Sequence, residues 1–301
     1  MPFRVNVAGT YRPVIGAWIR FQNAWRRLNG IWVRTGGSWR KAYSPEMDIG
    51  PAGTTRYNIN LYEEYRKYTG DNSGSPIDFK FNILCNIGSA STSLPSLDCS
   101  TIPAGSTIII INQAWIVGKG GNGGFATTNG NVGNGEAGGL GIRLSPGSSY
   151  TIENFSAIGG GGGGGGGNNG VICGGCGYTI CCTAYSATGQ GGHGLPRGSD
   201  GACSGSRCSP SSETQIGGWC SPNNGVCGPF CYYLGGYGGF WGSPGYLPSG
   251  CGGCGSGNFC YCCLSWPGFK RGTNGGAGAA IQWNGGSLVL VNRGSVYGSV
   301  G

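Results

Sequence analysis

The stretch Ala157-Ile158-GGGGGGGGG-Asn168 holds nine consecutive glycines, Gly159–Gly167, and shorter glycine clusters continue on both sides of it. A flexible linker has such a composition, but a linker does not run from residue 118 to residue 301 with embedded Trp, Tyr, Ile and Cys. The alternative is a backbone that only glycine can build, in which left-handed extended helices with ~3 residues per turn pack side by side. Ordering glycine is entropically costly, so we expect a bundle in which each lateral hydrogen bond returns about 1 kcal/mol.

Composition and charge place the chain outside the ordinary globular range. Gly accounts for 68 of 301 residues and 10% of residues are charged, while aromatic residues remain at 11%, which argues against a disordered chain. The net charge of +8 is local, because residues 1–45 hold eight basic side chains and no acid. A basic patch can bind nucleic acid. No nucleic-acid-binding motif accompanies this one, so we favour solvated strand faces or a contact with an acidic protein.

Residues 1–45 contain an internal repeat built on tryptophan. Its members recur every seven positions: Trp18, Trp25, Trp32 and Trp39. A heptad helix has this period, but Gly30 and Gly36-Gly37 argue against a helix. Asn29-Gly30 lies between apolar runs and is a strong hairpin signal. We therefore predict a four-strand antiparallel β module with further turns near Gln22-Asn23 and Gly36-Gly37. The tryptophans are then core or subunit-contact side chains, with carbohydrate binding as a second interpretation.

For residues 46–117, the sequence predicts a small shoulder domain of mixed α/β or β structure with one short helix. Asn60 and Glu63 have the spacing of a capped helix start, and Gly70 is suited to a helix end. The expected helix therefore lies near residues 60–69.

Strand patterns follow this helix in the shoulder. Residues 78–83 alternate like a half-buried strand, and residues 107–111 and 114–117 indicate further strands. The last two runs are too short and interrupted to span a membrane.

Three stretches, taken in order, resemble a known family. They are residues 103–107 (PAGST) leading into 112–124 (NQAWIVGKGGNGG), Ile158 with its glycine tract, and residues 275–281 (GGAGAAI) followed by 292–299 (NRGSVYGS). Together they resemble the receptor-binding tip proteins of tailed bacteriophages, which include the T-even long-tail-fibre adhesins and glycine-rich siphophage tail-tip domains. Residues 57–70 and 87–89 resemble the segment that precedes the glycine region in those proteins, so the resemblance covers roughly residues 55–301.

The resemblance implies a polyglycine II sandwich, a rigid scaffold of stacked glycine rods. The rods of the family end in variable loops at a distal face, and these loops grip an outer-membrane protein or a surface glycan of the host. The Trp-repeat region is similar to short β modules of phage tail proteins and would attach the chain to other tail proteins. The expected location is the virion tail: the chain is made in the host cytoplasm and acts outside the cell. Residues 1–14 have no apolar stretch, so we expect no secretory signal.

The 16 cysteines are typical of an oxidising compartment, and release of a virion by lysis would supply one. A motif repeats among the 14 that lie between residues 173 and 263, and its members are Cys173, Cys176, Cys181 and Cys182, then Cys251, Cys254, Cys260, Cys262 and Cys263. Two CxxC pairs also suit a four-thiolate zinc site, but the pairs lie far apart with other cysteines between them. We favour disulfides in surface loops, with Cys85 and Cys99 as a further possible pair.

Aromatic residues crowd the loops of the last third of the chain. The candidates for receptor binding are Trp219, Tyr232, Tyr233, Phe240, Trp241, Tyr246, Tyr261 and Trp266. Tyr and Trp give large contact area at low entropic cost and dominate interfaces. The alternative is that such rings cap the sides of the glycine lattice, because glycine rods supply no apolar core.

No catalytic site is predicted. Glycan hydrolysis needs two placed carboxylates, and the four acids after residue 118 show no such pairing. His193 is the only histidine and lies in a Gly-His-Gly segment that suits a glycine rod. The glycine clusters do not follow a strand and open a helix, so nucleotide binding is not expected either. We predict no cofactor.

These patterns predict a mainly β chain with much irregular structure in three parts: an antiparallel β attachment module (1–45), a shoulder (46–117) and a polyglycine II domain with disulfide-rich loops (118–301). The predicted function is a non-enzymatic phage tail-fibre or tail-tip adhesin, presented rigidly. A purely structural fibre component is the competing interpretation. A homotrimer suits a fibre, although some family members act as single-copy caps.

Overall fold

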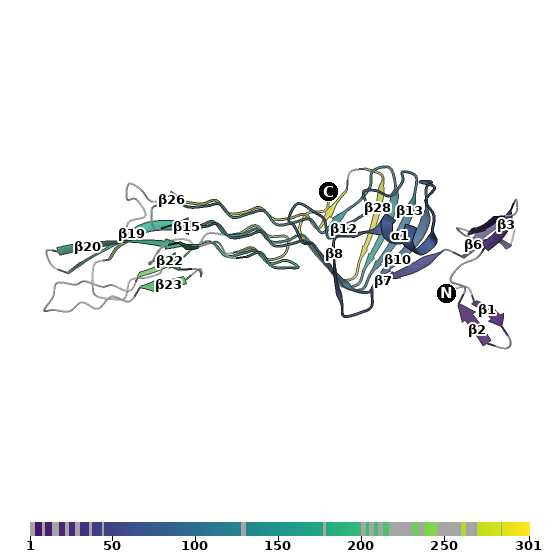
Figure 1. The fold of residues 1–301 in the computed structure, drawn as a ribbon, viewed down its shortest axis with the longest axis horizontal. Coiled ribbons are helices and arrows are strands. Elements are labelled where there is room, and N and C mark those ends of the chain that lie inside the picture. The colour runs from purple at the N-terminus through teal and green to yellow at the C-terminus, as the bar shows by residue number, and fades with distance from the viewer. Residues whose placement is uncertain are drawn as a thin grey trace.

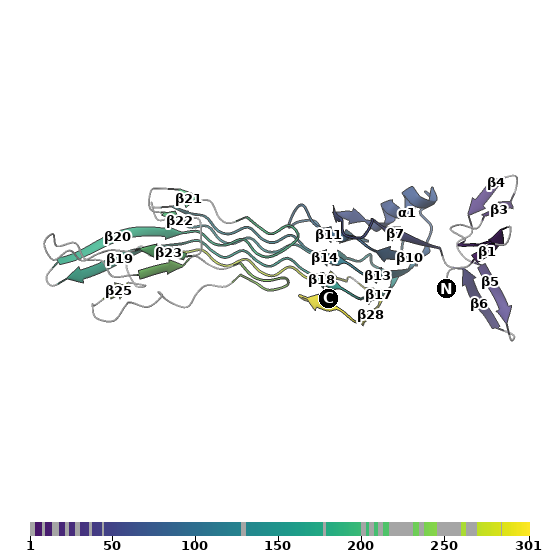
Figure 2. The ribbon, with the colours of Figure 1, turned by 90° about the horizontal axis from the view of Figure 1, so that it is seen from below.

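The chain is elongated, with three regions along its length (Figures 1 and 2). It is known from a computed structural model, which describes residues 4–7, 10–13, 18–21, 24–27, 31–35, 38–43, 45–127, 131–176, 179–199, 203–204, 208–209, 213–216, 231–234, 238–245, 260–262, 270–283 and 285–301. N-terminal hairpins lie at one end, a β body follows, and extended segments run from the body to the distal strands. The described residues are mainly β with one short helix, as the sequence predicted.

The body is a parallel β-helix with three sheets. The first sheet contains β7 (Glu46–Ile49), β10 (Asp78–Ile83), β13 (Thr107–Asn112), β17 (Ser149–Asn154) and β28 (Ser287–Asn292). The second contains β8 (Thr55–Tyr57), β11 (Asn86–Gly88), β14 (Trp115–Val117), β18 (Ala157–Gly159) and β29 (Ser295–Tyr297). The third contains β9 (Ile59–Asn60), β12 (Leu97–Asp98), β16 (Ile142–Arg143) and β27 (Ile281–Gln282). The chain visits the three sheets in turn and adds one parallel strand to each of them on every visit, except that the last coil adds strands to the first and second sheets only.

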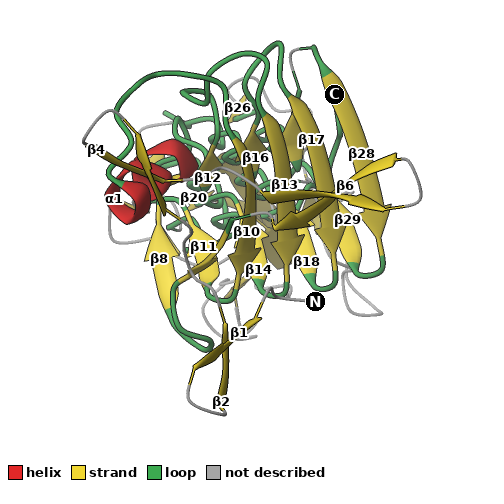
Figure 3. Cartoon of the chain, turned by 90° about the vertical axis from the view of Figure 1, so that its right-hand side faces the viewer, coloured by secondary structure: helices red, strands yellow, loops and turns green. Residues whose placement is uncertain are grey.

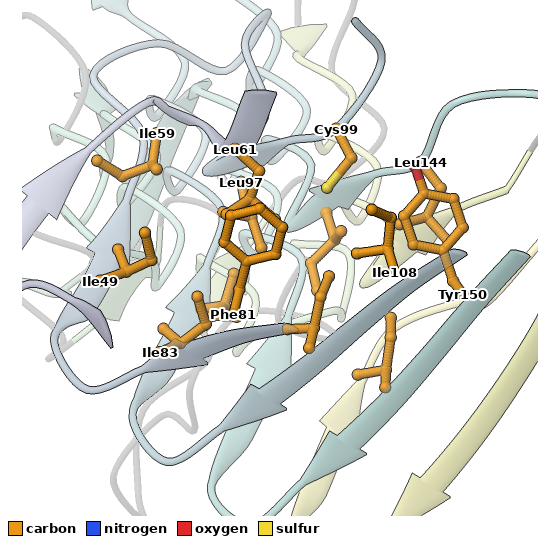
Figure 4. Close-up of a cluster of buried hydrophobic side chains, with 14 of the residues drawn as sticks. Ile49, Ile59, Leu61, Phe81, Ile83, Leu97, Cys99, Ile108, Leu144 and Tyr150 are labelled. Carbon is orange, nitrogen blue, oxygen red and sulfur yellow. The ribbon is translucent and has the colours of Figure 1, made fainter. Parts of the chain in front are cut away.

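Apolar residues stack from coil to coil and form the core (Figure 4). In the first sheet, Phe81 lies beside Ile110 in register, and Ile110 lies beside Ile152. All three are fully buried. The alternating pattern of residues 78–83 thus predicted a strand correctly, because odd positions point into the β-helix and even positions point outward.

An asparagine ladder runs through the corner after the first sheet. Asn112 Nδ2 donates to Asn154 Oδ1 at 2.8 Å, and Asn154 Nδ2 donates to Asn292 Oδ1 at 2.8 Å and to the carbonyl of Ser295 at 3.0 Å. Asn112 and Asn154 are fully buried. The ladder therefore satisfies buried polar groups where the chain turns between sheets.

The single described helix, α1 (Leu61–Thr69), covers the first coil. The Asn60 side chain accepts the backbone N–H of Glu63, and Gly70 ends the helix with φ +71°. The predicted helix and both of its caps are confirmed. Tyr65 packs edge-on against Phe79, with ring centroids 5.1 Å apart. Figure 3 shows α1 at one end of the stack of coils and β28 at the other.

Cys85 and Cys99 are both buried and free, so the expected pairing between them is wrong. Cys85 lies at the corner between the first and second sheets, whereas Cys99 follows β12 of the third sheet. The two thiols therefore lie in different parts of the core. Burial raises the pKa of both thiols, so they stay protonated and act as small apolar side chains.

The glycine-rich segments leave the body at one corner, between the second and third sheets. Residues 118–141 connect β14 to β16, and residues 160–280 connect β18 to β27. Both segments are therefore enlarged versions of the connection between the second and third sheets. The three sheets accordingly include strands on both sides of the boundary that we predicted at residue 118.

The far ends of these segments carry short strands. A mixed sheet holds β22 (Cys208–Ser209), β20 (Thr179–Ala187), β19 (Asn168–Cys176) and β25 (Cys260–Cys262), with β26 (Lys270–Arg271) also paired to β19. Two smaller sheets pair β15 (Ala126–Thr127) with β21 (Cys203–Ser204), and β23 (Glu213–Ile216) with β24 (Cys231–Leu234). In Figures 1 and 2 these strands lie at the end of the molecule opposite the N-terminal hairpins.

The N-terminal region forms antiparallel hairpins. They pair β1 (Arg4–Val7) with β2 (Thr10–Pro13), β3 (Trp18–Phe21) with β4 (Ala24–Arg27), and β5 (Ile31–Thr35) with β6 (Ser38–Tyr43). The antiparallel prediction is confirmed. The expected single four-strand sheet is not, because the described strands form separate two-stranded hairpins. The sequence repeat specifies each hairpin locally and carries no signal for pairing between hairpins. Across the described ranges, none of the helical structure is long and apolar enough to cross a membrane.

Candidate functional site

The glycine run of residues 159–167 lies at the centre of a bundle of extended segments, and all nine of its residues are buried. Each backbone N–H from Gly160 to Gly167 donates to one of the neighbouring segments rather than along its own chain. The acceptors include the carbonyl oxygens of Gly139, His193 and Ser243. This central run is therefore held entirely by lateral hydrogen bonds.

The lateral bonds repeat every third residue. Carbonyls of the central run accept the N–H groups of Gly118, Gly121 and Gly124 along one segment, and those of Gly272, Gly275 and Gly278 along another. In the opposite sense, the N–H groups of Gly161, Gly164 and Gly167 donate to Gly139, Glu136 and Gly133 in turn. A spacing of three is that of a backbone with three residues per turn.

Close backbone approach explains why glycine is required at inner positions of this run. A Cβ on Gly160 would lie 1.9 Å from the carbonyl oxygen of Gly278, and one on Gly163 would lie 2.0 Å from that of Gly275. Both contacts are to backbone atoms, which cannot rotate away. By contrast, the exposed Gly276 on an outer segment has open space at its Cβ position. Side chains are therefore excluded from the inside of the bundle and tolerated on its surface.

A polar network ties three segments together at the side of the bundle. Glu136 Oε2 accepts the Asn122 side-chain amide at 2.6 Å, and Asn122 Oδ1 accepts both the N–H and the hydroxyl of Ser199 at 3.0 Å. The hydroxyl of Thr92, in the loop between β11 and β12, donates to Glu136 Oε1. This acid thus has a positioning role in the scaffold.

An aromatic cluster occupies the junction where the glycine segments meet the body. Trp241 stacks on Phe240 with centroids 5.3 Å apart and planes inclined by 24°. Trp115 of β14 and Tyr297 of β29 meet Trp241 edge-on at 5.2 and 5.6 Å. His193 lies 5.4 Å from Phe240. The cluster, which we call the junction cluster, thus joins two glycine segments to two sheet strands.

The junction cluster is only partly buried. Phe240 is 51% exposed and Trp115 is 45% exposed. The backbone of its members is nevertheless fixed: the N–H of Trp115 donates to Asn86 Oδ1 at 3.1 Å, and His193 both donates to Gly239 and accepts from Gly162. The sequence prediction that His193 lies in a glycine segment is thereby confirmed. Trp115 and Tyr297 were not among the predicted site residues, because they occur singly in strand sequences.

The predicted receptor-binding aromatics fall in different places. Phe240 and Trp241 lie in the junction cluster, at the base of the glycine segments. Tyr232 and Tyr233 lie in β24 and Tyr261 in β25, among the distal strands, where the structure describes only the backbone. Trp219, Tyr246 and Trp266 lie outside the described residues.

The cysteine motif and the Trp repeat also lie where side chains are not described. Cys173 and Cys176 are in β19, Cys181 and Cys182 in β20, and Cys260 and Cys262 in β25, while Cys251, Cys254 and Cys263 lie outside the described residues. Trp18, Trp25, Trp32 and Trp39 occupy β3, β4, β5 and β6 in turn. Within the part of the chain that the structure describes, no group of three or more His, Cys, Asp or Glu side chains is placed to hold a metal.

Comparison with known protein families finds that residues 46–301 match the family described as phage tail fibre adhesin Gp38. The match covers the whole β body, every glycine segment and the distal strands.

The chain belongs to the phage tail fibre adhesin Gp38 family.

Membership of the Gp38 family confirms the predicted function. The chain is a non-enzymatic, receptor-binding adhesin of a bacteriophage tail fibre, and its place is the virion. The family description also agrees with the resemblance carried by residues 112–124, the glycine tract and residues 275–281. No curated protein matches the chain.

One solved structure is similar to this Gp38 family member. It is the gp37–gp38 adhesin tip complex of the bacteriophage S16 long tail fibre, with 21% sequence identity over 85% of this chain and 83% of that one, and a TM-score of 0.44. A likeness at this level assigns neither a partner nor a binding residue to this chain.

Proposed function

We propose that this adhesin works by rigid presentation: a polyglycine II lattice holds the distal loops away from the β-helix, and these loops grip an outer-membrane protein or a surface glycan of the host. The observation that carries the proposal is the three-residue period of lateral hydrogen bonds around Gly159–Gly167. That period is the symmetry of left-handed helices with three residues per turn. A stiff support lowers the entropy lost on binding.

The distal location of the cysteine-rich strands supports the same mechanism. The described strands β19, β20, β22, β23 and β25 lie at the end of the glycine segments farthest from the N-terminal hairpins (Figures 1 and 2). Disulfides among their cysteines would limit loop motion, stabilising each loop by about 2–4 kcal/mol. The receptor contact is assigned to the aromatics of these loops.

The N-terminal hairpins are assigned to attachment on another tail protein. They lie on the far side of the β-helix from the distal strands, and a virion protein that contacts a cell at one end needs an anchor at the other. In register, Trp18 lies opposite Arg27 and Trp39 opposite Arg34. Tryptophan and arginine are the residue types most enriched at interface hot spots. Attachment in a homotrimer and attachment as a single-copy cap are both compatible with this arrangement.

Competition for adsorption tests the receptor assignment. Purified full-length chain at saturating concentration is expected to block adsorption of the virus to host cells. A variant with Trp219, Tyr246 and Trp266 changed to Ala should lose this block, whereas the exposed-residue control Phe155→Ala, on the β-helix, should keep it. Unchanged adsorption in the presence of saturating wild-type protein would instead support a purely structural fibre component.

A further inference from the structure

We infer that the junction cluster is a second binding site, for a neutral sugar chain, distinct from the distal loops. The cluster is a surface of five rings, Trp115, His193, Phe240, Trp241 and Tyr297, and its two outer members are about half exposed. Exposed apolar side chains that occur singly need no explanation, but a contiguous group marks an interaction site. The inference rests on the proposed function, because it places the site on a molecule that contacts a cell surface.

The chemistry of the rings favours a sugar. The face of a pyranose ring presents C–H groups with slight positive charge, and an aromatic face is negative at its centre. The hydroxyl groups at the rim of the sugar need hydrogen-bond partners, which the His193 ring and the Tyr297 hydroxyl supply. None of the five members carries a carboxylate, an ammonium or a guanidinium group, so the site suits a neutral sugar better than an acidic one.

Aromatic rings are enriched at protein interfaces as well, so the polar ring edges and the lack of charge on the cluster carry the assignment to a sugar. Ring surfaces with polar atoms at their edges match the alternation of C–H faces and hydroxyl rims in a sugar chain.

The site is organised before any ligand arrives. Trp115 is held by its backbone bond to Asn86 at 3.1 Å, and the turn at Trp241 is held because the N–H of Gly242 donates to Gly160 of the central run at 2.8 Å. Trp241 is fixed between its ring neighbours. Binding a sugar would therefore cost little ordering entropy at the protein.

The position of the site fits a cell surface that carries both proteins and glycans. The central run from Gly159 to Gly167 extends about 25 Å at the rise of a three-residue helix. The junction cluster contacts the end of this run nearest the β-helix, between Gly159 and Gly162, so most of that length separates it from the distal strands. A loop that reaches a membrane protein would then leave the junction cluster among the sugar chains that project from the same surface. Two weak contacts on one rigid body add to the avidity of attachment.

The test uses the full-length chain on an array of neutral and acidic oligosaccharides, followed by calorimetric titration with the best neutral binder. Trp115→Ala and Phe240→Leu are expected to weaken that binding at least tenfold. Phe155→Ala is the matched control, because Phe155 is an equally exposed ring (44%) between β17 and β18 and packs under Arg293 at 5.3 Å. It should bind as the wild type does.

Several outcomes would overturn the inference. They are binding to no neutral sugar, binding to acidic sugars alone, unchanged binding in both cluster variants, or equal loss in Phe155→Ala. Thermal unfolding of each variant checks the fold, and Phe240→Leu keeps apolar bulk so that loss of the ring is isolated. The distal-loop variant of the adsorption assay should still bind the oligosaccharide, so failure here and failure of the distal-receptor proposal are distinguishable.

Discussion

A methyl group on Gly163 would lie 2.0 Å from the carbonyl oxygen of Gly275, and no side-chain movement can relieve that contact. Gly276, one residue further along the same outer segment, is exposed and has nothing within 4 Å of its Cβ position. Both glycines lie in glycine-rich segments, yet only Gly163 is required by packing.

We therefore predict that Gly163→Ala lowers the free energy of unfolding by at least about 3 kcal/mol, because the backbones must separate to admit the methyl group. Gly276→Ala is the matched control and should be neutral or slightly stabilising, since it only restricts the unfolded chain. Thermal or denaturant unfolding of both variants gives the comparison. Equal stability of the two variants would show that the interior of the bundle is loose.

Asp71 gives the fold an acid-sensitive contact beside α1. The backbone N–H of Ser73 donates to its carboxylate at 2.9 Å and the Tyr65 hydroxyl donates at 2.9 Å. These bonds lower the pKa of Asp71 below its usual value. A lowered pKa stabilises the fold above the ordinary pKa of the carboxyl group, and that contribution is lost as the pH falls through the folded value.

Asp71→Asn is accordingly predicted to be less stable than the wild type at about pH 7. The difference should shrink as the pH falls below the ordinary range of an aspartate, where the wild-type carboxylate takes up its proton. Melting temperatures measured across this range provide the check. A gap of constant size at every pH would mean that the charge of Asp71 makes no contribution.

At the level of elements, the asparagine ladder links three coils of the β-helix. Asn154 is its fully buried middle member, and its side chain takes part in four hydrogen bonds, with Asn112, Ser156, Asn292 and Ser295. Removing the Asn154 side chain takes away all four bonds at once, and each buried polar group left unsatisfied costs about 1–3 kcal/mol.

Asn154→Ala should therefore lower the free energy of unfolding by about 3 kcal/mol or more. Asn82→Ala is a suitable control, because the Asn82 amide bonds to Asp48 at the surface at 2.9 Å. It is expected to change stability by less than about 1 kcal/mol. A similar loss of unfolding free energy in both variants would show that the ladder makes no special contribution to stability.

The distal hairpin offers a test of the cysteine prediction. Cys173 lies directly opposite Cys182 in the register of β19 and β20, and the Cα atoms of directly opposed residues in antiparallel strands lie about 4.5–5.5 Å apart, within the range that a disulfide spans. We expect these two cysteines to be linked. Peptide mapping without reductant should yield the linked peptide, whereas stoichiometric zinc and free thiols would favour the metal site instead.

The sequence predicted elements with local signals and missed those without. The helix was predictable because Asn60 and Gly70 cap it within ten residues of sequence. The β-helix was not, because its stacked positions are unevenly spaced: Ile83, Asn112, Asn154 and Asn292 are register partners separated by coils of very different length. Enlarged coils hide the period that would reveal the repeat.

The candidate site likewise contains a part that the sequence predicted and a part that it did not. The glycine run predicted a scaffold of closely packed backbones, because no other residue type fits where backbones touch. The junction cluster was only half visible, since Phe240 and Trp241 are adjacent in sequence whereas Trp115 and Tyr297 reach them from separate strands. Contacts between coils cannot be predicted from a single sequence without the register that joins them.

For the molecule as a whole, rigidity follows from where the glycine segments begin and end. They leave and re-enter the β-helix at one corner, so both ends of each segment are fixed in a packed core. Between those ends, bonds to several neighbours replace the side-chain packing that glycine lacks. The result is an extended support that carries irregular loops at one end and is anchored at the other (Figure 1).

Amide hydrogen exchange within residues 159–167 tests this claim most directly, with the chain unfolded in denaturant as the reference. Every N–H from Gly160 to Gly167 has a lateral acceptor, so we predict exchange far slower than the reference and comparable to that of the β-helix strands. Exchange as fast as in the unfolded reference would contradict the lattice and remove the support from the distal loops.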